Sequence, residues 1–496
     1  MTGRRHAVVI GSGFGGLAAA VRLGARGYRV TVLERLRQPG GRAGVFRQDG
    51  FTFDAGPTII TAPFMFEELW QLCGRSFSDD IKMRAMDLFY RIIFDDGSHF
   101  DCLADDDAMR REVARVSPGD VRGFERFLRY SEAVYRIGFE ELGDKPFSSI
   151  GDMLRIAPDL FRFGALRSVH ATVSKYVEHP YLRFALSFHP LFVGGNPFAT
   201  TSVYCLISFL ERHWGVSFAM GGTGALVRGL VDLIEGQGGT VRCGSEVTGI
   251  SVEAGKASGV RLASGEVIAS DIVVSNADVA WTYKTLLAET PRKRWTDRKL
   301  SRSRHSMSLF VWYFGTKKQY SQVPHHTILL GPRYRGLVED IFRCRGLAAD
   351  FSLYLHHPTV TDPSLAPDGC DTFYVLSPVP NLDAGIDWAT QAEPYRRAIE
   401  ERLSERLLPG LRDQIISSRV FTPQDFRDQY LSVKGAAFGF QPLLTQSAWF
   451  RPHNRSEDVD GLYLVGAGTH PGAGVPGVLS SARVLDSIVP HAGSLA

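Results

Sequence analysis

Cysteine is scarce in this chain, and the few thiols show no metal-binding pattern. No two of them form a C-x-x-C pair, and they are scattered over the 496 residues as Cys73, Cys102, Cys205, Cys243, Cys344 and Cys370. A chain of this length buries enough apolar surface to fold without disulfides. We therefore expect the thiols to pack as small hydrophobes in a reducing compartment, and we predict no metal site.

An excess of charge of one sign is also missing. The 56 basic and 53 acidic residues leave a net charge of +3, so no overall field favours a nucleic acid partner. Residues 292–304 are a local exception, with seven basic residues against the single acid Asp297. Two interpretations of this basic segment stay open: a solvated linker, or a patch that contacts anionic lipid head groups.

The sequence has no uninterrupted hydrophobic run of the roughly 20 residues that a membrane-spanning helix needs. Residues 184–210 contain no Asp, Glu, Lys or Arg, but Pro190, Gly194, Gly195 and Pro197 interrupt them. The apolar stretch at residues 6–21 carries a glycine frame and no signal-peptide cleavage site. We therefore expect a cytoplasmic protein.

Glycine, in contrast, is abundant, with 51 residues, and the first cluster of glycines has a recognisable frame. Gly11, Gly13 and Gly16 follow a short apolar segment at residues 6–10 and precede a helical pattern at 15–27; Glu34 ends the next apolar segment. This is the pattern of a dinucleotide-binding βαβ unit, in which a helix N-terminus faces the diphosphate. Glu34 would accept a hydrogen bond from a ribose hydroxyl, which disfavours NADP.

Two further segments favour FAD over NAD. Residues 39–42 (Pro-Gly-Gly-Arg) directly follow the ribose acid, and residues 53–58 (Phe-Asp-Ala-Gly-Pro-Thr) come next. Backbone without side chains at Gly41 and Gly56 lets the chain run against an elongated cofactor, and Arg42 can pair with the diphosphate. A surface position for Arg42 is the alternative.

The most specific motif lies near the C-terminus. Five glycines fall within residues 466–477, between an apolar strand pattern at 461–465 and a helical pattern at 475–489. A second helix N-terminus is therefore predicted to face the same ligand, where it would stabilise negative charge on a reduced flavin ring.

These motifs resemble those of the bacterial-type phytoene desaturases. Residues 461–477, 189–198, 218–226 and 275–278 match that family in order and spacing, and the resemblance covers nearly the full length. The resemblance implies an FAD enzyme that removes hydrogen from adjacent carbons of a long polyene, adding double bonds in steps toward neurosporene or lycopene. It also implies peripheral association with the inner membrane and oxygen or a quinone as the terminal electron acceptor.

The expected architecture is an α/β fold with a discontinuous Rossmann-like FAD-binding domain, an inserted α+β substrate domain with a mixed sheet, and a helical, membrane-facing lid. The FAD-binding domain would comprise residues 1–75, 216–290 and 455–496, and the substrate domain residues 76–110 and 300–454. Residues 111–215 read as largely helical. Within them, residues 184–210 are expected to form either a tunnel wall for the substrate or a lid that dips into the membrane; ordinary core packing is the alternative.

The motifs and the resemblance together assign cofactor binding to eighteen residues: Gly11, Ser12, Gly13, Gly15, Gly16, Glu34, Arg35, Gly41, Arg42, Gly56, Pro57, Thr58, Val247, Asn276, Gly466, Gly468, Gly474 and Val475. The candidates for proton transfer are Asp152, Arg155 and His470. Asp152 and Arg155 also have the i, i+3 spacing of an ordinary surface ion pair, and His470 can instead orient the glycine loop. Three other functions stay open: a desaturase of a modified carotenoid such as hydroxy- or methoxyneurosporene, a flavin amine oxidase, and a non-catalytic lipid carrier.

Overall fold

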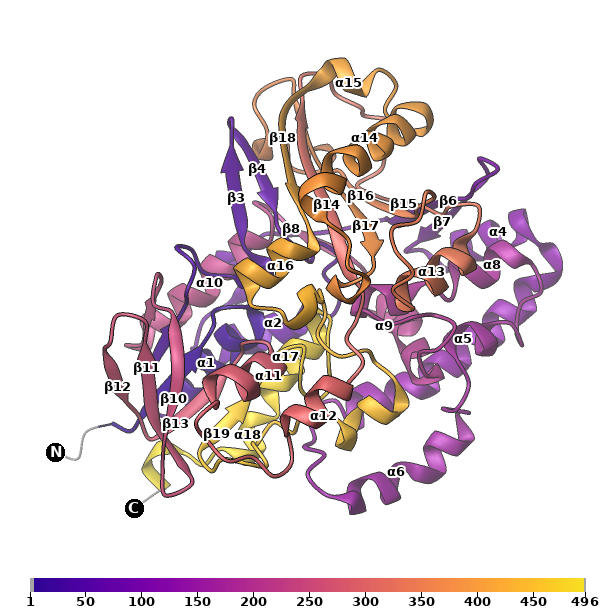
Figure 1. The fold of residues 1–496 in the computed structure, drawn as a ribbon. Coiled ribbons are helices and arrows are strands. Elements are labelled where there is room, and N and C mark those ends of the chain that lie inside the picture. Colours follow the sequence, from indigo (N-terminus) through magenta and orange to yellow (C-terminus); the bar gives the residue numbers. More distant parts are fainter. Residues whose placement is uncertain (1–3, 495–496) are drawn as a thin grey trace.

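The structure, a computed structural model, describes residues 4–494. A parallel five-stranded sheet lies at one end of the molecule (Figure 1), in the order β19-β13-β1-β2-β9. Strands from the start, middle and end of the chain therefore pair with one another. Their bounds are β1 (His6–Ile10), β2 (Arg29–Leu33), β9 (Thr240–Arg242), β13 (Ile272–Ser275) and β19 (Leu462–Leu464).

Both faces of this sheet are covered, which explains why β1 is an unbroken apolar run. Ala7 and Val9 face a core that includes the helices α1 (Phe14–Ala25), α2 (Phe64–Leu72), α10 (Thr223–Gly236) and α17 (Val475–Arg483). Val8 and Ile10 face a second core with an antiparallel three-stranded sheet made of β10 (Val247–Glu253), β11 (Lys256–Leu262) and β12 (Val267–Ala269).

A seven-stranded mixed sheet forms the second large layer. Its order is β18-β14-β17-β16-β15-β6-β7, and the pairing of β15 with β6 is parallel. The strands are β6 (Leu88–Ile93), β7 (His99–Leu103), β14 (Ser308–Thr316), β15 (His326–Leu329), β16 (Leu353–His356), β17 (Asp371–Val379) and β18 (Ile415–Phe421). Alternate residues of β14 pack against α14 (Trp388–Arg406) on one face and toward the interior of the molecule on the other. Two ribbons, β3 (Val45–Gln48) with β4 (Phe51–Asp54) and β5 (Met83–Ala85) with β8 (Ser217–Ala219), complete the strands.

The middle of the chain is helical, as its pattern predicts. Figure 1 shows these helices beside the seven-stranded sheet, on the side away from β10–β12. They are α4 (Asp106–Val116), α5 (Val121–Tyr135), α6 (Ile150–Arg162), α7 (Val169–Val173), α8 (Pro180–Ala185) and α9 (Leu206–Trp214). Among residues 4–494, no helix is both long enough and apolar enough to cross a membrane.

Two helices have boundaries set by local features. The helix α14 begins at Trp388, because Asp387 caps its N-terminus by accepting a hydrogen bond from Ala389 N–H. Pro394 therefore lies inside the helix and does not start it. The helix expected at 475–489 is divided into α17 and α18 (Leu485–Ile488).

Candidate functional site

One cavity of about 620 Å³ connects the parallel sheet, the seven-stranded sheet and the central helices. Its volume falls in the range typical of small-molecule sites. The loops after β1, β2, β13 and β19 line one part; β14, β16 and β17, together with α5, α6 and α9, contribute to the rest. The loops at the carboxyl ends of the parallel strands thus meet side chains from distant parts of the chain.

The first glycine turn brings backbone against backbone at the start of α1. A Cβ on Gly16 would lie 2.0 Å from the Gly11 carbonyl oxygen, so only glycine fits there. Gly13 is the N-cap residue and no side chain caps the helix, which leaves the first N–H groups of α1 open toward the cavity. Ser12 N–H and Oγ–H donate to Glu34 Oε2 at 2.9 and 2.7 Å, which fixes the carboxylate at the end of β2.

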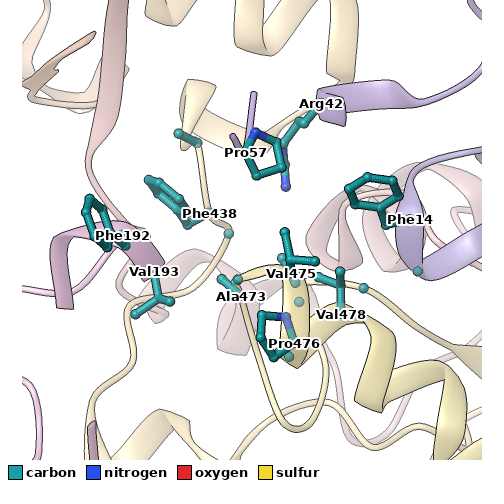
Figure 2. A pocket seen from close by; sticks show the side chains of 18 of the residues that line it. Phe14, Arg42, Pro57, Phe192, Val193, Phe438, Ala473, Val475, Pro476 and Val478 are labelled. Atoms are coloured by element: carbon teal, nitrogen blue, oxygen red, sulfur yellow. The ribbon is translucent and has the colours of Figure 1, made fainter. Parts of the chain in front are cut away.

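Arg42 points into the cavity from the short 3₁₀ turn at Gly41–Ala43 (Figure 2). Its Nη2 donates to Ser432 Oγ at 3.0 Å, while its buried Nε has no partner. Burial lowers the pKa of the Arg42 guanidinium, although Asp278 and Tyr430 nearby counteract this. A partly buried cation with an unpaired donor is a suitable partner for an anionic ligand.

The second glycine loop faces the first across Asn276. A Cβ on Gly466 would lie 2.6 Å from Asn276 Oδ1, and a Cβ on Gly15 would lie 2.7 Å from the same atom. Gly474 is the N-cap residue of α17, at φ 95°, and no side chain caps this helix either. In Figure 2, Val475 lies below Arg42 across the open space. Two uncapped helix N-termini therefore border one cavity.

The predicted cofactor residues gather at this cavity. All of them line it except Ser12, which holds Glu34, and Gly16, which permits the close packing of turn and helix. Val247 and Arg35 mark the far end of the cofactor region; Arg35 Nη1 donates to the carbonyl oxygens of Asp428 and Gln429.

The three candidates for proton transfer do not all lie at the cavity, although Arg155 Nη1 and Asp152 Oδ1 are 3.8 Å apart. His470 lines the cavity, its Nε2 lies 3.3 Å from the Leu142 carbonyl oxygen, and burial lowers its pKa to about 4, so its ring is neutral at pH 7. Asp152 and Arg155 are not among the residues that line the cavity. Asp152 accepts from Ser149 N–H and Oγ–H in a capping box at the start of α6, and the side chain of Arg155 is 82% exposed. A catalytic role for Asp152 and Arg155 stays a prediction, and neither side chain lines the cavity.

The part of the cavity away from the glycine loops has mainly apolar walls, and we call it the apolar end. It is lined by side chains of α5, α6, α9, the 3₁₀ turn His189–Val193 and the residue before that turn: Val134, Met153, Ile156, Leu160, Phe188, Leu191, Phe192, Leu206, Ile207 and Leu210. The uncharged segment 184–210 therefore forms much of this wall, and its large apolar residues are buried or half-buried. The segment lies both in the cavity wall and in the hydrophobic core, and its role as a tunnel wall for a substrate stays a prediction.

One polar group in this wall was not predicted from the sequence. Glu211, 3% exposed, lines the cavity directly after the uncharged segment ends. Tyr90 Oη–H donates to Glu211 Oε2 at 2.8 Å, and His189 Nε2 lies 3.1 Å from the same oxygen. The signal in the sequence was the first charge after 27 uncharged residues, but its partner Tyr90 lies 121 residues away in the chain.

A second missed network lies where Thr58 meets the seven-stranded sheet. Thr58 Oγ1 lies 2.7 Å from Tyr374 Oη and 3.1 Å from Tyr354 Oη, and Tyr354 Oη lies 2.7 Å from His326 Nδ1. Burial lowers the pKa of His326 to about 3, so the imidazole is neutral. This network holds the loop that carries Pro57 and Thr58 against the sheet.

Comparison with known proteins identifies the family. The flavin-containing amine oxidoreductase family matches residues 14–484. A neurosporene-forming phytoene desaturase of Rhodobacter capsulatus is 52% identical over 99% of this chain and 95% of its own length. A lycopene-forming phytoene desaturase of Pseudescherichia vulneris is 50% identical over 98% of this chain and 99% of its own length. The crystal structure of an engineered putrescine oxidase shares the fold, with a TM-score of 0.67, 12% identity and 98% of each chain covered.

The cofactor is FAD, and the residues fit it. The unpaired Nε of Arg42 and two open helix N-termini suit a diphosphate and an electron-rich ring, and glycine backbone leaves room for both. The Glu34 carboxylate, held by Ser12, stands at the position of a ribose-binding acid. The chain therefore belongs to the flavin-containing amine oxidoreductase family and, within it, to the bacterial-type phytoene desaturases.

Proposed function

We propose that this protein desaturates phytoene in successive FAD-dependent steps toward neurosporene or lycopene. The observation that carries the proposal is the continuity of one cavity, from the glycine loops to the apolar end. Phytoene is a hydrocarbon without an ionisable group, so its binding depends on apolar contact and shape. Two relatives that share about half of their residues with this chain are named phytoene desaturases, which supports the same substrate class.

FAD, when bound, accepts the hydride that leaves the substrate. The protein's own contribution is to bind and orient both molecules and to exclude water. Arg42 and the α1 N-terminus would hold the diphosphate, and the α17 N-terminus at Val475 would stabilise negative charge on the ring. The aromatic rings of Phe188 and Phe192, 5.1 Å apart between centroids, would pack against the polyene.

We further propose a division of the chain that follows the cavity. Residues 1–75, 216–290 and 455–496 would form the cofactor domain, and residues 76–110 and 300–454 the substrate domain with the seven-stranded sheet. Residues 111–215 would form the helical part that covers the substrate. In this arrangement α6 is the lid, because Met153, Ile156 and Leu160 line the cavity.

The outer face of α6 supports a peripheral contact with the cytoplasmic face of the inner membrane. Ile150, Leu154 and Phe161 are 61%, 70% and 78% exposed and lie on one side of the helix. A single large exposed apolar residue is unremarkable, but three on one helix face form a patch suited to lipid. The basic segment 292–304 lies near α6: Arg294 lies over the ring of Trp449, and the turn Ala448–Phe450 that carries Trp449 packs against α6.

The activity is tested by expressing the protein in a bacterium that accumulates phytoene and separating the pigments by HPLC with absorbance spectra. New coloured polyenes, lost in a Glu34→Ala variant and kept in the exposed control Glu235→Ala, would support the proposal and count the steps. Unchanged phytoene with flavin bound to the protein would direct the search to hydroxy- or methoxyneurosporene. Peroxide release with amines would instead support an amine oxidase.

The membrane contact is tested by sedimentation with anionic vesicles. Each apolar side chain that inserts adds about 1.5 to 3 kcal/mol, so replacing Ile150, Leu154 and Phe161 by serine should weaken binding by well over tenfold. The control variant replaces Val267, whose side chain is also exposed but lies on β12 and not on α6. Equal vesicle binding of the α6 variant and the Val267 variant would contradict a membrane contact made by the outer face of α6.

The reoxidation of the cofactor by oxygen or by a quinone is distinguished by assays with and without each acceptor.

A further inference from the structure

Glu211 stands out because it is an acid buried in an apolar wall with no arginine or lysine bound to it. Both of its hydrogen bonds, from Tyr90 Oη and with His189 Nε2, end on Oε2, and Oε1 takes part in neither. The neighbouring cation Arg212 pairs with Asp106 at the surface and not with Glu211. Burying an acid in this way is costly for stability, so such groups are commonly retained for chemistry.

The three side chains form a closed hydrogen-bonded set. Tyr90 Oη lies 2.8 Å from Glu211 Oε2 and 3.0 Å from His189 Nε2, and the buried Nδ1 of His189 has no partner. Tyr90 comes from β6, His189 from a 3₁₀ turn and Glu211 from α9, so three separate elements converge on one oxygen. Their convergence fixes the orientation of the carboxylate in the wall.

The position of the set links the apolar end to the cofactor loop. The turn His189–Val193 begins at the set, and a Cβ on Gly474 would lie 3.2 Å from Val193 Cγ1. A 3₁₀ turn rises about 2 Å per residue, so the turn spans roughly 8 Å. The hydrogen-bonded set that holds Glu211 thus begins one short turn away from the residue that approaches the second glycine loop, and Glu211 lines the same cavity as that loop.

We propose that Glu211 accepts the proton that leaves the substrate, and that Tyr90 and His189 are positioning residues; this inference rests on the proposed desaturase function. Desaturation breaks two C–H bonds on adjacent carbons. One hydrogen leaves with its electron pair as hydride to FAD, the other leaves as a proton to the Glu211 carboxylate, and the remaining electron pair becomes the new π bond. Tyr90 and His189 hold Oε2 and stabilise the carboxylate before the proton arrives.

The competing residues are less well placed. Asp152 lies outside the cavity lining, and His470 uses Nε2 on the Leu142 carbonyl oxygen. Asp159 lines the cavity from α6 but lies on the proposed lid. The titratable groups around Glu211 are Tyr90 and Cys102, from β6 and β7, and His189.

The test uses holoenzyme mixed anaerobically with phytoene in vesicles, and follows bleaching of the flavin absorbance in one turnover. General base catalysis is typically worth about 10²- to 10⁴-fold, so Glu211→Gln should slow bleaching by that factor, and Glu211→Asp should restore part of the rate. Glu235→Gln is the control for loss of an acid at the surface. Tyr90→Phe and His189→Gln should shift the pH profile of the bleaching rate.

A second readout does not depend on rate. Infrared difference spectra of the reduced minus oxidised complex should show a new carboxylic acid carbonyl band that Glu211→Gln lacks and Glu235→Gln keeps. Flavin content and melting temperature establish that each variant is folded. If Glu211→Gln does not fold, Glu211→Asp takes its place, and its carbonyl band must lie at a different frequency from that of the wild type.

The outcomes separate the two hypotheses. If wild-type flavin is not bleached by phytoene, the proposed function fails. If the wild type bleaches, an unchanged rate and band in Glu211→Gln overturn the role of Glu211. Loss of the band in Asp159→Asn, or loss of the bleaching rate in a His470 variant, with Glu211→Gln unaffected, overturns it as well.

Discussion

Arg42 is expected to contribute to the affinity for FAD but little to the stability of the folded apoprotein. We expect Arg42→Gln to weaken FAD binding while leaving the apoprotein about as stable as before. In the structure, Arg42 makes one hydrogen bond to protein, from Nη2 to Ser432 Oγ, and its Nε is buried without a partner. Losing the bond to Ser432 costs about 1 kcal/mol, but removing a cation that burial disfavours offsets this loss.

The expected loss of FAD affinity in Arg42→Gln is derived from the hydrogen bond that Arg42 would donate to the diphosphate. A hydrogen bond to a charged group contributes about 1.5 to 3 kcal/mol, and each 1.4 kcal/mol is a factor of ten in affinity. One such bond from Arg42 to the diphosphate therefore predicts a dissociation constant for FAD that rises about 10- to 100-fold. The assay is titration of apoprotein with FAD, followed by quenching of flavin fluorescence, with a thermal melt of each apoprotein.

Ser432→Ala is the matched control, because it removes the protein partner of Arg42 and leaves the guanidinium in place. Its affinity for FAD should stay within about threefold of the wild type, since a neutral hydrogen bond contributes little net free energy. A large drop in the melting temperature of the Arg42→Gln apoprotein, with FAD affinity unchanged, would refute the reasoning and make Arg42 a structural residue.

Three further predictions concern steric fit and pH. Gly16→Ala should yield protein without flavin, since its Cβ would meet the Gly11 carbonyl oxygen at 2.0 Å, whereas Gly236→Ala, with open space around it, should keep flavin. Burial raises the pKa of Asp54 to about 6, so the wild type should lose on the order of 3 kcal/mol of stability as pH rises from 4 to 6; Asp54→Asn should lack this loss in thermal melts. Burial lowers the pKa of His470 to about 4, so the wild type should lose stability as pH falls from 6.5 to 4, and a His470→Asn variant that melts with the same pH dependence would contradict this.

The cofactor region could be predicted from the sequence because its constraints are local. Gly11, Gly13, Gly16 and Glu34 lie within one βαβ unit, and each is required by a turn, a close approach or a hydrogen bond inside that unit. The second glycine loop is likewise read from one continuous segment. Where backbone atoms leave no room for a side chain, the sequence must have glycine. Such glycines can be recognised from the local motif without knowledge of distant residues.

The strand order and the side of α6 that faces the cavity could not be predicted in the same way. β6 pairs in parallel with β15 across more than 200 residues, and nothing in either segment specifies that neighbour. The i, i+3 spacing of Asp152 and Arg155 indicates an ion pair but not the side of α6 that faces the cavity; that side carries Met153 and Ile156. Long-range packing decides both features.

The same contrast explains why the substrate is harder to specify than the cofactor. Any side chain at Gly15 or Gly466 would meet Asn276 closer than 3 Å, so the cofactor loops accept one residue type. The apolar end, by comparison, demands only apolar side chains of suitable volume, as Ile207 and Leu210 illustrate. Relatives that form neurosporene and lycopene are 52% and 50% identical to this chain, a difference too small to choose between the products. If the proposed function holds, we expect the length and shape of the apolar end to influence the number of desaturation steps, so substitutions there should change the pigment distribution without changing flavin content.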